Sequence, residues 1–332
     1  MTIYDISEKA GVSIATVSRV LNGSSSVSDS TRQKVLDVIE SCGYTPNVFA
    51  RGLGLNTMKT IGIMCADSSD LYLAKAIYYM EQKLRANGYN SILSCSGYEP
   101  EAKAESMNLL INQKVDGVIL LGSNFIHENE EDNRYIPDAA RQIPVMLLNA
   151  AMDAPNIYSV VSDDKTSVYE ATEYMIASGV KDILYFYNSD SYSGKRKLSG
   201  YLAAMDKHGL KPLTEFYKGS HEDIPAMTDR LKALCANGTS FHGVIAANDS
   251  LALAAVKYAG ELNMSLPDDL AVIGFNNSML ATCCQPELTS IDNKLEPLCQ
   301  HLIDTLMGVL AGKDMPRKTV LSGELVTRGT TH

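Results

Sequence analysis

From residue 60 onward, short apolar runs alternate with longer segments whose apolar residues recur at helical spacing. This alternation of strand and helix favours an α/β fold, in which doubly wound parallel sheets carry helices on both faces. The number of runs suits two subdomains, over about 60–161 and about 162–290, with crossovers near 290–325. A ligand is expected in the cleft where the carboxyl ends of the strands meet. The runs are TIGIMCA, NSILSC, DGVILLG, IPVMLLN, KDILYFYN, HGVIAAN and LAVIGFN, with helices predicted over 71–87, 101–113, 164–178 and 250–263.

The residues before this region have a different pattern, which predicts three short helices. Thr2 with Asp5 forms a capping box for a first helix, and Gly11 ends it. Ser13 caps a second helix and Ser28 a third. The link AGVS joins two helices of about two turns, as in the tight turn of a helix-turn-helix.

The second of these helices, in the stretch VSIATVSRVLNG, has the character of a DNA recognition helix. Val17, Val20 and Leu21 form an apolar stripe, and the opposite face carries small hydroxyl and apolar side chains with one arginine. Hydroxyls and amides suit phosphates, an arginine suits guanine, and small apolar groups suit thymine methyls. A three-helix packing module without a ligand is the alternative. The predicted DNA contacts are Ser13, Ile14, Ala15, Thr16, Ser18, Arg19 and Asn22.

The charge distribution limits where DNA can bind. The formal net charge is −10, yet residues 1–60 hold six Lys and Arg against five acids. The remainder holds 23 basic and 34 acidic residues, so it repels DNA. Seven scattered cysteines, no signal peptide and no membrane-spanning run predict a soluble cytoplasmic protein.

The sequence contains neither a GxxxxGK[ST] phosphate-binding loop nor a GxSxG nucleophile motif. GLGLN precedes a strand and lacks a third glycine, so it is not a dinucleotide loop. The six histidines lack HxH or HExxH spacing, and no metal or cofactor is predicted. Asp67 with Asp70, and Asp163 with Asp164, lie at strand-to-helix junctions, where helix capping explains them. A cytoplasmic α/β enzyme, or a solute-binding protein with an incidental helical N-terminus, remains the alternative.

VSIATVSRVLNG, GYTPN and AR-G-L followed by KTIGI resemble, in order and spacing, the head and hinge of the lactose/galactose repressor (LacI/GalR) family. The resemblance implies a helix-turn-helix domain over 1–46, a hinge over 47–59 and an effector-binding and dimerisation core over 60–332. It implies further DNA contacts from Tyr44, Asn47, Arg51 and Leu53, where the leucine of each subunit wedges into a central CG step of a pseudo-palindromic operator. Gly52 departs from the usual serine or glutamine, which weakens the hinge helix. A linker residue packed on the core is the alternative for Leu53.

The resemblance also implies a core similar to type 1 periplasmic binding proteins, with a sugar or sugar-derived effector between its subdomains. Tyr72 takes the place of a ring-stacking aromatic, Lys197 that of an arginine, and Asn276 that of the usual aspartate. The exchanges at Lys197 and Asn276 predict that the site tolerates an anionic effector. For each residue the alternative is an ordinary polar group at a strand end. The full predicted set is Tyr72, Asn149, Lys197, His221, Asn248, Asn276 and Asn293, with Asn248 and Asp249 matching the family's ND pair.

The expected function is therefore a DNA-binding transcriptional regulator, a repressor, whose operator affinity is controlled by a small molecule. The sequence ends without leucine heptads, so we expect a homodimer and not a tetramer.

Overall fold

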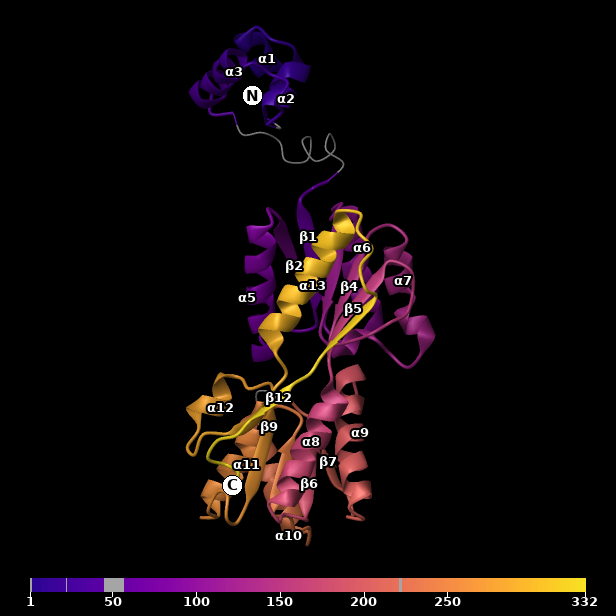
Figure 1. Ribbon diagram of the computed structural model, residues 1–332, viewed down its shortest axis with the longest axis vertical. Coiled ribbons are helices and arrows are strands. Elements are labelled where there is room, and N and C mark those ends of the chain that lie inside the picture. Colours follow the sequence, from indigo (N-terminus) through magenta and orange to yellow (C-terminus); the bar gives the residue numbers. More distant parts are fainter. Residues whose placement is uncertain (1, 22, 45–56, 221–222) are drawn as a thin grey trace.

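The computed structural model describes residues 2–21, 23–44, 57–220 and 223–332. It contains a small helical head at the N-terminus and two α/β subdomains that follow it (Figure 1). The predictions for Asn22, Asn47, Arg51, Leu53 and His221 lie outside the described residues.

The head consists of three helices, α1 (Ile3–Ala10), α2 (Ile14–Leu21) and α3 (Asp29–Ser41). The capping box between Thr2 and Asp5 is present, and Gly11 ends α1 with a left-handed backbone at φ 61°. Ser13 accepts from the Thr16 backbone, and Ser28 caps α3. The three predicted helices are thus confirmed. Their shared core is Ile6, Ala10, Val17, Val20 and Val35.

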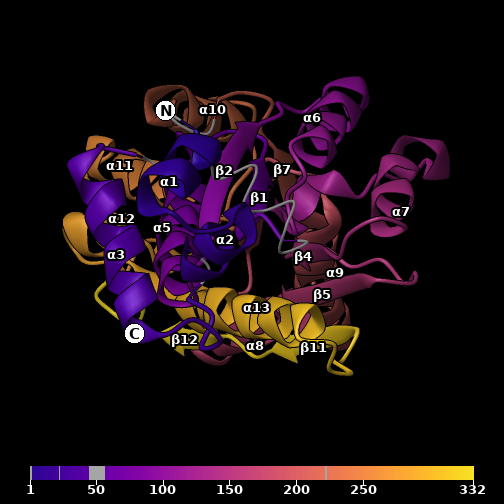
Figure 2. The ribbon, with the colours of Figure 1, turned by 90° about the horizontal axis from the view of Figure 1, so that it is seen from above.

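The first sheet has the strand order β11-β5-β4-β3-β1-β2, and all its pairs are parallel. Figure 2 shows α6 and α7 on one side of this sheet, with α5 and α13 on the other. Its elements are β1 (Thr60–Cys65), β2 (Asn90–Cys95), β3 (Gly117–Leu121), β4 (Val145–Leu148), β5 (Ile157–Ser162), β11 (Lys318–Leu321), α5 (Leu71–Ala86), α6 (Pro100–Asn112), α7 (Tyr135–Ala140) and α13 (Leu295–Leu310).

The second sheet has the order β12-β10-β9-β8-β6-β7, and only its β10–β12 pair is antiparallel. Its core includes the stacked rings of Tyr185 and Tyr201. Its elements are β6 (Ile183–Tyr187), β7 (Leu213–Phe216), β8 (Gly243–Ala246), β9 (Ala271–Phe275), β10 (Thr289–Asp292), β12 (Glu324–Val326), α8 (Asp164–Ala177), α9 (Tyr192–Lys207), α10 (Ile224–Ala236), α11 (Asp249–Glu261) and α12 (Met279–Cys283).

The predicted fold class is confirmed, and each of the seven predicted apolar runs forms a strand. The chain passes between the subdomains three times, after β5, after β10 and after β11 (Figure 1). As a consequence α13 and β11 complete the first subdomain although they lie near the end of the chain. Five strands were not predicted, namely β5, β7, β10, β11 and β12.

Candidate functional site

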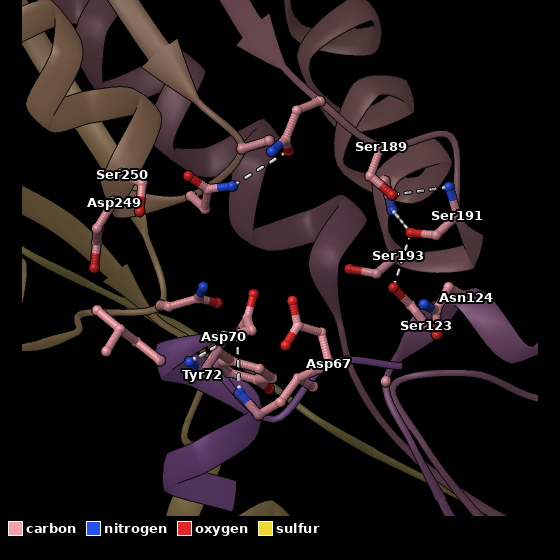
Figure 3. A pocket seen from close by; sticks show the side chains of 18 of the residues that line it. Asp67, Asp70, Tyr72, Ser123, Asn124, Ser189, Ser191, Ser193, Asp249 and Ser250 are labelled. Carbon is pink, nitrogen blue, oxygen red and sulfur yellow. Dashed lines mark hydrogen bonds between the residues drawn. The ribbon is translucent and has the colours of Figure 1, made fainter. Parts of the chain in front are cut away.

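A cleft of about 910 Å³ lies between the carboxyl ends of the two sheets. Loops that follow strands of both sheets line it, and Figure 3 shows the side chains of Asp67 and Asp70 pointing into it. His221 is not described, whereas Gly219 and Ser220 line the cleft. The lining brings together the other six residues of the predicted effector site: Tyr72, Asn149, Lys197, Asn248, Asn276 and Asn293.

Four of these residues form a hydrogen-bonded chain across the base of the cleft. The Tyr72 hydroxyl accepts from Asn149 Nδ2 at 2.5 Å and from Asn293 Nδ2 at 2.9 Å. Asn293 Nδ2 also lies 3.3 Å from Asn276 Oδ1, which belongs to the second sheet's side of the cleft. Burial raises the pKa of Tyr72, so the hydroxyl keeps its proton. Tyr72 therefore contributes a hydroxyl that joins the two subdomains, besides the ring that the resemblance implied.

Two amide oxygens in this chain have no partner among the described residues. Asn149 Oδ1 and Asn293 Oδ1 are buried without a hydrogen bond, and the two residues are only 7% and 2% exposed. A buried acceptor without a donor is costly, so these atoms suit a ligand that donates hydrogen bonds. Asn149 and Asn276 have left-handed backbones, at φ 60° and 99°, which asparagine adopts more readily than most residues.

The ammonium group of Lys197, on α9, already has interaction partners within the protein. Its Nζ donates to the Ala247 carbonyl at 3.0 Å and lies 3.6 Å from the centre of the Phe275 ring. Burial lowers the pKa of Lys197, and the carboxylates of Asp164 and Asp249 oppose this shift. Burial in turn raises the pKa of both aspartates, and the Lys197 charge opposes it. The ammonium thus balances two buried carboxylates instead of standing free for a ligand.

The charge of the lining argues against the expectation that the cleft tolerates an anion. Within the described lining, Asp67, Asp70, Asp190 and Asp249 face a single lysine, Lys197. The expectation rested on the exchanges at 197 and 276, and the aspartates after β1 were expected to act as helix caps. Asp70 does cap α5, since it accepts from the Tyr72 and Leu73 backbones, but its charge also reaches the cleft. Such a lining repels phosphorylated or acidic ligands.

The capping roles of other polar residues are also visible. Asp163 caps α8, as its place at a strand-to-helix junction predicted. Asn248 caps α11 by accepting from the Leu251 backbone at 3.0 Å, and its amide donates to Asn188 at 3.3 Å. Asn248 therefore shapes its loop as well as lining the cleft.

Sequence reasoning missed several lining side chains. The rings of Phe216, at the end of β7, and Tyr98, after β2, offer apolar faces. Ser123 and Ser191 join the two sides of the mouth through a 2.8 Å hydrogen bond (Figure 3). Ser123 lies two residues after the end of β3, so the rule that ligands bind at strand carboxyl ends would have found it.

In the head, α2 presents the predicted face to solvent. Val17 and Val20 are buried, whereas Ala15 and Arg19 are exposed and Ile14 is 40% exposed. This exposed side is free of acidic side chains, as a surface that meets phosphates requires.

The polar members of the predicted DNA contacts differ in their surroundings. Ser13 and Thr16 share a 2.9 Å hydroxyl contact at the start of α2, and Ser18 is half-buried. Tyr44 is half-buried and packs against the core of the head. Only part of the Tyr44 side chain is therefore accessible to a partner.

Two features are absent from the described part of the chain. Among residues 2–21, 23–44, 57–220 and 223–332, no group of three or more His, Cys, Asp or Glu is arranged to hold a metal ion. In the same ranges, no helix is both long and apolar enough to cross a membrane.

Comparison with known proteins matches the two parts of the chain to two family models. Residues 2–47 match bacterial regulatory proteins of the lacI family, and residues 172–331 match a periplasmic binding protein-like domain. The chain is 51% identical to an HTH-type transcriptional regulator from Lachnoclostridium phytofermentans, over 100% of both chains. The lac repressor dimer bound to operator and the anti-inducer ONPF is 25% identical, with a TM-score of 0.88 over 100% of this chain and 99% of that one. A complex of the transcriptional regulator CelR with cellobiose is 24% identical, with a TM-score of 0.71 over 99% of each chain.

Proposed function

Because the chain belongs to the lacI family of bacterial regulatory proteins, which are DNA-binding transcriptional regulators, we propose that it is a repressor controlled by a small carbohydrate. A homodimer binds the operator through two heads, and the carbohydrate binds in the cleft of each core. The helix-turn-helix domain spans 1–46, the hinge 47–59 and the core 60–332. Such a protein works in the bacterial cytoplasm, where the operator lies.

The composition of the cleft carries the proposal for the effector. The unpartnered oxygens of Asn149 and Asn293 suit hydroxyl donors, and the rings of Phe216 and Tyr98 suit the apolar face of a sugar. The four aspartates of the lining favour a neutral ligand over a phosphorylated or acidic one. We therefore expect a neutral mono- or disaccharide as the effector.

A thermal-shift screen of matched sugars tests this proposal. Neutral sugars, their 6-phosphates and their uronic acids are compared, and stabilisation is expected only from neutral members. Asn276→Asp should change which sugars bind, since it replaces an amide donor by an acceptor on a backbone that both residues tolerate. Asn277→Asp is the matched control, because Asn277 bonds Arg328 outside the lining. Stabilisation by the sugar 6-phosphates alone would contradict the proposal that the effector is a neutral sugar.

Sequence-specific DNA binding rests on the exposed Arg19 of α2. Arg19→Ala should cost roughly 1–3 kcal/mol at one base pair of each half-site. Arg141→Ala removes the same charge from an exposed position of the core and serves as control. Fluorescence-anisotropy titration with a selected operator and its single-base variants measures both. An equal loss for the two variants would show that Arg19 contributes charge only.

The role proposed for Leu53 rests on the resemblance, because Leu53 lies outside the described residues. We propose that Leu53 of each subunit inserts into a central CG step, because pyrimidine–purine steps unstack at low cost. Leu53→Ala should weaken operator binding and abolish the preference for CG at that step. Gly52→Ala should stabilise the hinge helix by up to about 1 kcal/mol and so tighten binding. Titration of operators that differ only at the central step measures both effects, and a preference retained by Leu53→Ala rules out the wedge.

A further inference from the structure

Two cysteines face each other where the first sheet meets the cleft. Cys65 ends β1 and Cys95 ends β2, and the two are register partners on adjacent parallel strands. Their Sγ atoms lie 3.8 Å apart. Neighbouring strands run about 4.8 Å apart, which is within the Cα separation of about 4.4–6.8 Å that a disulfide spans. The backbone therefore already has a spacing that allows the two sulfurs to bond.

The two thiols differ in accessibility. β2 is the edge strand of the sheet, and Cys95 is exposed there. Cys65 is buried in the core that includes Ala76 and Met80 of α5. Burial and the neighbouring Cys95 raise the pKa of Cys65 to about 12. An oxidant from solution thus meets Cys95 first, since the thiolate is the reactive form and the exposed sulfur is the accessible one.

We propose that Cys65 and Cys95 are a redox site, in which a peroxide converts the two thiols into a disulfide. The Cys95 thiolate attacks one peroxide oxygen, the O–O bond breaks and hydroxide leaves, which gives a sulfenic acid on Cys95. The Cys65 sulfur then attacks that sulfur, the S–O bond breaks, and the hydroxyl leaves with the Cys65 proton as water. Overall, two thiols are oxidised and one hydrogen peroxide is reduced to two waters. A thiol reductant reverses the reaction.

The disulfide would act on the rim of the cleft. Asp67 lies two residues after Cys65 and Tyr98 three residues after Cys95, and both line the cleft. The Ser96 N–H donates to the Cys65 carbonyl at 2.9 Å and the Gly97 N–H to the Ala66 carbonyl at 3.1 Å. Drawing the sulfurs together to about 2.05 Å ties these two loops covalently. The oxidised protein therefore has a more rigid rim, whatever ligand the cleft takes.

Peptide mapping of the full chain tests the chemistry. The reduced protein is treated with a slight excess of hydrogen peroxide, remaining thiols are alkylated, and trypsin is added. Residues 60–75 and 86–103 form tryptic peptides that each hold one cysteine. A cross-link between them is expected, with loss of two free thiols and recovery by dithiothreitol. Cys95→Ser should abolish the cross-link, whereas Cys283→Ser, which removes another exposed thiol, should leave it unchanged.

The unfolded chain provides the decisive comparison. The same treatment in urea should give a cross-link yield at least fivefold lower, because the sheet no longer holds the sulfurs together. Equal yields in both states, or sulfinic acid on Cys95 without a cross-link in the folded protein, would overturn the proposal.

Hydrogen-exchange mass spectrometry tests the effect on the rim. On oxidation, amides in segments 66–72 and 96–99 should exchange at least fivefold more slowly, and those of segment 243–248 in the second subdomain should not change. Unchanged exchange in both rim segments of the cross-linked protein would reject the rigid rim.

Discussion

A single hydroxyl at the base of the cleft ties together residues that are distant in sequence. Tyr72 accepts from Asn149 and Asn293, and these amides have little access to water. Tyr72→Phe leaves the Asn149 amide without an acceptor and leaves the Asn293 amide only its 3.3 Å contact with Asn276, so we expect it to lower the free energy of unfolding by roughly 1–3 kcal/mol. Tyr78→Phe, at a side chain that is 50% exposed, should change it by less than about 0.5 kcal/mol. Urea denaturation of both variants measures the difference, and equal values would mean that the cleft relaxes to satisfy the amides.

At the same scale, sequence reasoning placed residues better than it assigned their partners. The rule that ligands bind at strand carboxyl ends predicted the cleft, and the resemblance supplied Tyr72, Asn149 and Asn276, all of which line it. The partners of Lys197 were beyond reach, because Ala247 and Phe275 come from β8 and β9 regions far along the chain.

Among the elements, the loop after β3 depends on an unusual buried lysine. Lys103 of α6 donates to the Asn124 carbonyl at 2.7 Å and lies 3.0 Å from His127 Nε2. Burial, and then the Lys103 charge, lower the pKa of His127 from its ordinary 6.5, whereas Asp132 opposes the shift. Folding thus favours the neutral ring. The stabilisation that comes from the neutral His127 ring should be fully present above about pH 6.5 and should be lost as the pH falls below that value. The reason is that the unfolded chain then binds a proton at His127 more readily than the folded chain does.

Thermal unfolding at about pH 7.5 and about pH 5.5 measures this dependence. His127→Gln removes the titrating ring and keeps an acceptor for Lys103, so its unfolding temperature should fall less on acidification than that of the unaltered protein. His242→Gln, at an exposed ring, should not reduce the fall. An identical pH dependence in the His127 variant would place the acid sensitivity elsewhere.

Three of the strands that the sequence failed to predict were missed for physical reasons of two kinds. β7 (LTEF) and β10 (TSID) carry polar side chains in short segments, so their apolar runs are too short to stand out. β11 joins the first sheet from near the end of the chain by pairing with β5. Such pairing depends on contacts distant in sequence, which local periodicity does not encode.

For the whole molecule, regulation requires the two subdomains to have more than one arrangement, because an effector acts only by favouring one state over another. In the described structure the mouth of the cleft is held by the Ser123–Ser191 hydrogen bond and by an ion pair between Glu128 and Lys195. Both contacts join the loop after β3 to the start of α9. The two contacts should therefore favour a closed arrangement, in which the two sides of the mouth lie together. Neither contact involves a residue of the head.

The ion pair can be tested by exchanging its charges. Lys195→Glu places two carboxylates together and should shift the balance towards an open cleft, by up to about fivefold, since exposed ion pairs contribute at most about 1 kcal/mol. Small-angle X-ray scattering should show a larger radius of gyration, and Glu128→Lys added to Lys195→Glu should restore it. Lys207→Glu makes the same charge change in a pair with Glu173 inside the second subdomain, so it should leave the radius unchanged. If Lys195→Glu and Lys207→Glu expand the molecule equally, net charge and not the mouth contact governs closure.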